Sequence, residues 1–172
     1  EVDGYIGFFE PGSRIWKLWD IHEMAYILYG LIMDHAFFGN ETALEAARKG
    51  ADYIMEVWGA DPDREPGGGE ITVYMGVTGL ETALLALHEA TGEVKYRDFC
   101  ADFRGLKTWD GPVVLRRWGQ IQGHSYAYCC RALAQLRLHR LTPEEALLRP
   151  TRRAMDFLLK EGPDEGNTSA TG

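Results

Sequence analysis

The chain has 172 residues, of which 45% are hydrophobic and 26% charged, which is typical of a soluble domain with its own core. Its formal net charge of −8 argues against a nucleic-acid or anionic-membrane surface, because phosphate groups are bound by excess Lys and Arg. A neutral or cationic small molecule, or a sugar, suits this charge better. The uncharged run Met24–Met33 is too short to span a bilayer, and three cysteines make no disulfide framework. The compartment therefore stays open.

The first predicted helical hairpin follows a loop over Glu1–Lys17. Asp20, with Glu23 three residues later, is typical of a helix N-cap. Met24–Phe38 is apolar almost all round, which predicts a helix buried on nearly every side. After a glycine turn, Thr42–Trp58 carries one apolar stripe and predicts an amphipathic helix that faces solvent.

The same unit recurs twice more along the chain. The second predicted pair is Thr78–Ala90 with Lys95–Arg104, and the third is Gln122–His139 with Glu144–Lys160. Pro150 is expected to kink or restart the last of these helices. The turns at Gly39, Gly92 and Leu141 are about 50 residues apart, which is a spacing typical of helical-hairpin arrays.

Alternation of apolar inner helices with amphipathic outer helices predicts an all-α fold in which hairpins surround an axis. Three hairpins make about half of an (α/α)6 toroid, so residues 1–172 are expected to be its N-terminal half, cut at both ends. His35, His88 and His139 are expected to be solvated near the turns. In the last outer helix, the residues expected to face inward are Thr151, Ala154, Met155 and Leu158.

The candidate binding residues are found at the other ends of the inner helices. His124, in the segment Q-I-Q-G-H-S-Y-A-Y-C-C-R over residues 120–131, and His22 each stand where an inner helix begins. Glu23 is a further candidate, and Trp19 and Tyr26 offer aromatic faces on which a sugar ring stacks. For the histidines a purely structural role stays open, as does core packing for the aromatic residues.

Cysteines and carboxylates give no complete catalytic or metal site in this sequence. Cys129 and Cys130 point about 100° apart on a helix and have no partner at ligand spacing, so they are interpreted as packing residues and no metal site is predicted. A glycosidase generally needs two carboxyl groups that flank the scissile bond. The candidates are not paired by spacing; they are Asp20, Glu23, Glu81 and Asp110.

Four segments carry a resemblance to a known family: W-D-I-H-E-M-A-Y-I-L-Y-G-L at Trp19–Leu31, G-N-E-T-A-L-E-A-A-R-K-G-A-D-Y-I at Gly39–Ile54, T-G-E-V-K-Y-R-D-F at Thr91–Phe99 and G-H-S-Y at Gly123–Tyr126. They resemble the N-terminal half of family-127-type glycoside hydrolases, the β-L-arabinofuranosidase-like proteins with an (α/α)6-toroid catalytic domain. Helix-hairpin consensus accounts for most of the matched positions, and other toroid families share it.

This resemblance implies a sugar-contacting histidine at His124 and pocket residues at His22 and Tyr26. It also implies that the catalytic glutamate, the cysteine nucleophile and a zinc site of three cysteines and a glutamate lie beyond Gly172. No cofactor is therefore expected in this stretch, although zinc is compatible with a longer protein. The expected partners are a carbohydrate substrate and the remaining half of the toroid.

The sequence thus predicts part of a glycoside hydrolase for arabinofuranosyl-type or related glycans, inactive by itself. Two alternatives stay open. One is another (α/α)-toroid carbohydrate enzyme, such as an unsaturated glucuronyl hydrolase or a polysaccharide lyase, which a basic cleft for uronic acids would favour. The other is a non-catalytic helical-repeat scaffold, in which the inner-helix starts need no Trp, His or Tyr.

Overall fold

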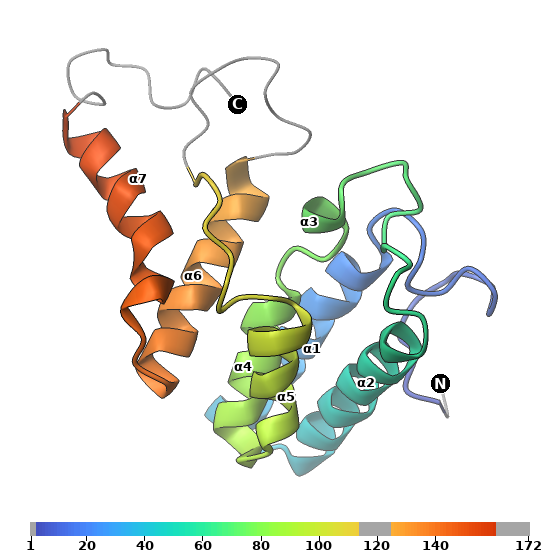
Figure 1. Cartoon of the computed structure of the whole chain (residues 1–172). Helices are drawn as coiled ribbons and strands as arrows, with labels where there is room; N and C mark the ends of the chain where they lie inside the picture. Colours follow the sequence, from blue (N-terminus) through green and yellow to red (C-terminus); the bar gives the residue numbers. More distant parts are fainter. Residues whose placement is uncertain (1–2, 114–124, 161–172) are drawn as a thin grey trace.

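A computed structural model describes residues 3–113 and 125–160, and all regular elements among them are helical (Figure 1). Outside these helices the described residues contain a single isolated bridge, between Gly68 and Ile71. The elements, in chain order, are α1 (Asp20–Phe38), α2 (Glu41–Ala60), α3 (Val73–Gly76), α4 (Leu80–Thr91), α5 (Val94–Asp98), the π-helical η1 (Phe99–Phe103), α6 (Ser125–Leu141), the 3₁₀ turn η2 (Glu145–Leu148) and α7 (Arg149–Lys160). The all-α prediction is confirmed.

Most of the described residues belong to three pairs of packed helical segments, which we call hairpins. Helix α1 packs on α2, α4 packs on α5 and η1, and α6 packs on η2 and α7. Helix α4 also contacts α1 on one side and α6 on the other, so the inner helices form a row with α4 in the middle (Figure 1). The hairpin turns lie at one end of this row and the longer connecting loops at the other. We call these the turn end and the loop end.

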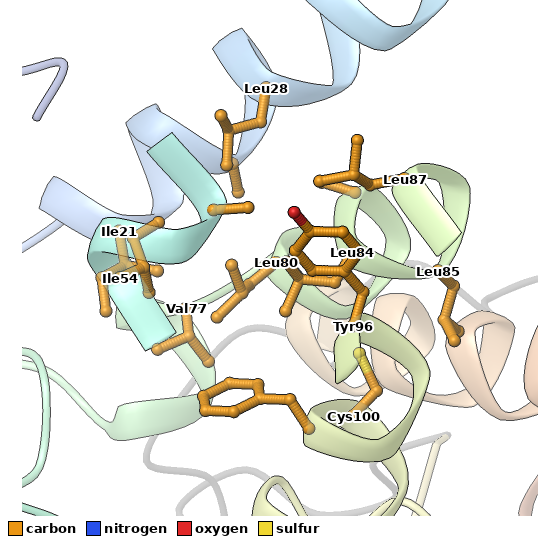
Figure 2. Packing of buried hydrophobic residues seen from close by; sticks show 14 of the residues in the cluster. Ile21, Leu28, Ile54, Val77, Leu80, Leu84, Leu85, Leu87, Tyr96 and Cys100 are labelled. Carbon is orange, nitrogen blue, oxygen red and sulfur yellow. The ribbon is translucent and has the colours of Figure 1, made fainter. Parts of the chain in front are cut away.

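The core lies where α1, α2, α4 and α5 meet (Figure 2). Helix α4 supplies its centre, because Leu80 and every residue from Ala83 to Leu87 are buried. Around it pack Ile21 and Leu28 of α1 and Tyr96 of α5. Each fully buried leucine or isoleucine side chain contributes roughly 1.5–3 kcal/mol relative to exposure. This core holds the loop ends of α1 and α4 in a fixed relation.

The hairpin turns are fixed by local hydrogen bonds. Gly39 and Gly92 end α1 and α4 in the left-handed conformation, with φ of 69° and 75°, which glycine adopts without steric cost. His88 Nδ1 lies 3.0 Å from the carbonyl oxygen of Glu93, and His139 Nδ1 lies 3.0 Å from that of Glu144. These histidines, like His35, are half-buried, so the expectation that they are simply solvated was wrong.

The predicted N-cap role of Asp20 was also wrong. Trp19 is the N-cap residue of α1 and makes no side-chain cap bond, while Asp20 is buried in the first turn. The Asp20 carboxylate instead accepts hydrogen bonds from the Tyr5 hydroxyl at 3.0 Å and from the Ile15 backbone N–H at 2.7 Å. Ile15 has a φ of 61°, which is unfavourable for a β-branched residue. Asp20 thus holds the N-terminal segment against the start of α1.

The third hairpin agrees with the sequence in outline. Pro150 was expected to kink or restart the outer helix; η2 ends at Leu148, and Pro150 is the second residue of α7. Ala154 and Leu158 are half-buried, but Met155, expected to face inward, is 50% exposed. The predicted start of the third inner helix at Gln122 lies outside the described residues.

None of the described helices is sufficiently long and apolar to cross a membrane.

Candidate functional site

The loop end of α1 presents a row of aromatic side chains. The Trp19 and His22 rings meet edge-on at 5.5 Å between centroids, and the His22 and Tyr26 rings do so at 4.9 Å. The spacings of three and four residues place all three on one face of the helix. The Tyr26 hydroxyl makes a hydrogen bond with the hydroxyl of Tyr126 on α6. We call these four side chains the aromatic row.

His22 is held in one orientation by the neighbouring inner helix. Its Nδ1 lies 3.0 Å from the carbonyl oxygen of Thr78, just before α4. Because a carbonyl oxygen only accepts hydrogen bonds, Nδ1 carries the proton in this contact, and Nε2 of the neutral ring remains an acceptor. Tyr26 and Tyr126 are 45% and 53% exposed, so the row is open to a ligand. An imidazole acceptor beside exposed tyrosines suits a hydroxyl-rich ligand.

The remaining predicted site residues have different surroundings. Glu23 is exposed at the start of α1, next to the row. Its charge adds to the effect of burial, the main cause, in raising the pKa of the Asp20 carboxyl group. His124 lies outside the described residues, so its predicted role stays a prediction. The structure therefore brings together Trp19, His22 and Tyr26, with Glu23 at their side.

The three cysteines are weak nucleophiles. Cys129 and Cys130 of α6 are half-buried, and burial raises the pKa of both thiols, that of Cys130 to about 11. Cys100 is fully buried, and burial raises the pKa of its thiol well above the ordinary value. Within residues 3–113 and 125–160, no three His, Cys, Asp or Glu side chains form a group able to hold a metal ion. The zinc site that the resemblance implies is expected beyond Gly172, so it stays a prediction.

A buried ionic cluster that we did not predict from the sequence joins α4, α6 and the end of η1. Oε1 of Glu81 accepts hydrogen bonds from Nη1 of Arg131 at 2.8 Å and from Nε of Arg104 at 3.1 Å. The three side chains are only 7–8% exposed. Arg131 also donates to the backbone carbonyl of Arg104. We call this group the arginine cluster; it pairs Glu81, one of the candidate carboxylates, with cations from two other elements.

Secondary structure explains how the arginine cluster is positioned. The π-helical turn η1, in which the Arg104 N–H bonds to the Phe99 carbonyl at 2.8 Å, turns Phe103 and Arg104 out of the α5 register. Gln135 of α6, itself buried, donates from Nε2 to the carbonyls of Leu106 and Trp109, each at 2.8 Å. Helix α6 thus fixes both Arg131 and the loop that follows Arg104.

A cleft of about 390 Å³ borders the arginine cluster. The side chains that matter in its lining are Trp58, Arg64, Tyr74, Phe103, Arg104 and Arg131. The Arg104 guanidinium lies 4.5 Å above the Trp58 ring, and that of Arg131 lies 5.4 Å from the rings of both Tyr74 and Trp109. Cations stacked on aromatic faces and open to a cleft form a potential binding site.

The sequence carried one signal for the arginine cluster. Glu81 and Arg131 each lie in a helix predicted to be buried, and a charged residue in such a position needs a partner. Spacing alone did not identify that partner, because the hydrogen-bonded residues are 23 and 50 positions apart. Of the other candidate carboxylates, Asp20 is engaged by Tyr5 and Ile15, and Asp110 pairs with Arg153 at 2.7 Å.

The helical hairpins and the aromatic row fit a carbohydrate-active domain, and comparison with known families agrees. Residues 2–112, more than half of the chain, match the family model described as Beta-L-arabinofuranosidase, GH127 catalytic domain. The chain belongs to this family and contains a glycoside-hydrolase-like domain. The matched range includes Trp19, His22, Glu23 and Tyr26 but ends before His124. Neither a curated protein nor a solved structure matches the chain.

Proposed function

We propose that this chain forms part of a glycoside hydrolase that acts on arabinofuranosyl-type or related glycans, and that the sugar binds at the aromatic row. Family membership supports a carbohydrate substrate. The observation that carries the location is the line of Trp19, His22, Tyr26 and Tyr126 across two inner helices. Aromatic faces pack on the C–H faces of sugar rings, and Nε2 of His22 accepts a hydrogen bond from a sugar hydroxyl.

The proposed architecture around this site is an (α/α)6 toroid in which the loop end faces the substrate. The row of three inner helices with outer helices behind them supports it. So do the apolar side chains left exposed on the third hairpin: Leu133 of α6 is 61% exposed and Leu159 of α7 is 70% exposed. Side chains of this kind are covered when another hairpin stacks against them.

In this proposal the described residues bind the sugar, and cleavage requires groups outside them. Glycosidases commonly place a carboxylic acid and a second carboxylate on either side of the scissile bond. Among the described candidates, Asp20 and Glu81 are buried and accept hydrogen bonds from other residues. Glu23 is the exposed carboxylate beside the row and is assigned a role in binding sugar hydroxyls. His124 is proposed as a further sugar contact.

The test compares binding and cleavage by the chain. It should bind an aryl arabinofuranoside without releasing arabinose, and Tyr26→Ala should weaken binding by about tenfold, as expected for loss of a stacking ring. Phe37→Ala is the matched control, since Phe37 is a 76%-exposed aromatic residue of the same helix at the turn end. Equal losses in both variants would contradict a site at the aromatic row, and release of arabinose would contradict the division between binding and cleavage.

A further inference from the structure

The arginine cluster holds more positive charge than its own carboxylate neutralises. Glu81 serves two guanidinium groups through a single oxygen, Oε1. Nη2 of Arg104 and Nε of Arg131 are buried and find no acceptor in the described part of the chain. An unpaired buried donor is costly, and a buried unpaired charge is more so. The cluster therefore keeps an excess of buried positive charge, which favours an anion beside it.

The cleft beside the cluster is open to such an anion. Its volume of about 390 Å³ lies in the range of small-molecule sites. Arg64 is exposed in the lining, where its guanidinium lies 4.4 Å from the Trp16 ring centroid. Glu65 is the carboxylate in the same lining. The cleft lining contains Arg64, Arg104 and Arg131, and the nearby carboxylates are Glu65 and Glu81. These five side chains carry one net positive charge, in a chain whose formal net charge is −8.

The cleft walls add a second chemical requirement. Trp58, Tyr74 and Phe103 present aromatic side chains in the same lining as the arginines. Aromatic surface beside guanidinium groups suits a ligand with an apolar C–H face and a carboxylate on one ring. A single net positive charge matches one carboxylate better than a doubly charged phosphate.

We infer that this cleft binds a uronic-acid residue, with its carboxylate at Arg64 and Arg104 and its ring against Trp58 and Tyr74. The sugar part of this inference rests on the proposed function, whereas the acidic part rests on the arginine cluster. No residue of the aromatic row lines this cleft. The two sites together define a substrate in which a neutral arabinofuranosyl residue occurs in the same glycan as an acidic sugar.

The experiment measures binding of a short oligogalacturonate and of its uncharged galacto-oligosaccharide counterpart by calorimetry at fixed ionic strength. The acidic ligand should bind about tenfold tighter or more. Arg104→Lys, which keeps the charge but loses the planar fork, should remove most of this preference. Arg64→Gln, at an exposed position, should weaken acidic binding about threefold without risk to folding. Arg152→Gln, an exposed arginine on α7, is the matched control and should bind like the unaltered chain.

Three results would overturn the inference: equal binding of the acidic and neutral ligands, wild-type binding by both Arg64→Gln and Arg104→Lys, or displacement of the oligogalacturonate by sulfate at the same concentration. The last would mean a general anion site. An aryl arabinofuranoside titrated into the same samples separates this inference from the proposed function. Its binding should respond to Tyr26→Ala and not to Arg64→Gln. The two variants therefore test the aromatic row and the cleft independently of each other.

Discussion

The two ends of the inner helices are built from different kinds of contact. At the turn end, partners are close in sequence: the Gly39 N–H bonds to the His35 carbonyl at 2.8 Å, and the Gly92 N–H to that of His88 at 2.7 Å. At the loop end, His22 reaches Thr78, 56 positions away, and Arg131 reaches Glu81, 50 positions away. The turn end closes each hairpin by itself, whereas the loop end exists only when the hairpins pack together. Ligand chemistry is expected at the loop end.

A short repeat accounts for the self-sufficient turn end. The second and third hairpins share the pattern L-H-x-x-T-x-E, at Leu87–Glu93 and Leu138–Glu144. In both, the histidine Nδ1 lies 3.0 Å from the carbonyl oxygen of the glutamate. The repeat therefore encodes a turn, and it carries no information about the ligand.

The largest expected effect is at the loop end. Glu81→Ala leaves Arg104 and Arg131 buried without a counter-charge and should lower the free energy of unfolding by about 3–5 kcal/mol. Glu89→Ala, on the same helix, breaks a more exposed pair with Arg137 and should cost less than about 1 kcal/mol. Urea unfolding followed by circular dichroism measures both, and similar losses would contradict the distinction between the two pairs.

The N-terminal segment gives the next effect. Tyr5→Phe removes a hydroxyl that donates to the buried Asp20 carboxylate and accepts from the Phe9 N–H at 3.0 Å. The variant should lose about 1–3 kcal/mol of unfolding free energy, because a buried carboxylate loses a donor. If thermal and urea unfolding leave Tyr5→Phe unchanged, Asp20 does not anchor this segment.

Alanine substitutions of a turn glycine and of a helix glycine should change the free energy of unfolding in opposite directions. Gly92→Ala forces a side chain into a φ of 75° and should cost roughly 1–2 kcal/mol, although nothing lies within 4 Å of the added carbon. Gly30→Ala, inside α1 and also without near neighbours, should gain about 0.5–1 kcal/mol through helix propensity. Melting temperatures should therefore move in opposite directions, and a shift in the same direction would contradict the assigned turn geometry.

The smallest effect concerns acid stability. The hydrogen bond from Arg137 is the main cause that holds the pKa of Glu89 below its ordinary value of 4.5. The folded state thus binds this proton more weakly than the unfolded state, so the contribution is present above about pH 4.5 and is lost as the pH falls through the lowered pKa. Between about pH 5 and 3 the free energy of unfolding should therefore fall less in Glu89→Gln than in the unaltered chain. The difference should be less than about 1 kcal/mol. An unchanged pH profile would contradict this pairing.

The hairpins were predictable because their signals are local. Apolar periodicity, glycine turns and Pro150 all act over a few residues, and the longer helices lie close to the predicted bounds wherever the structure describes them. The short α3 was not predicted. Trp19, His22 and Tyr26 could also be placed together, since their helical spacing shows one face.

The features that the sequence did not reveal depend on distant partners. The sequence predicts an N-cap at Asp20, whereas its carboxylate accepts hydrogen bonds from the Tyr5 hydroxyl and the Ile15 N–H. Tyr126 meets Tyr26 across 100 positions, and no periodicity links the two residues. The arginine cluster likewise joins three separate elements. Long-range pairing follows from tertiary packing, which propensity and spacing do not specify.

The most direct test of two separate sugar sites at the loop end is a two-dimensional ¹H–¹⁵N NMR titration that follows the tryptophan indole N–H signals. Trp19 reports on the aromatic row, while Trp58 reports on the cleft. An aryl arabinofuranoside should shift the Trp19 signal and leave Trp58 unchanged, and an oligogalacturonate should do the reverse. If both ligands shift the same indole, or neither indole responds, the account of two sites is contradicted.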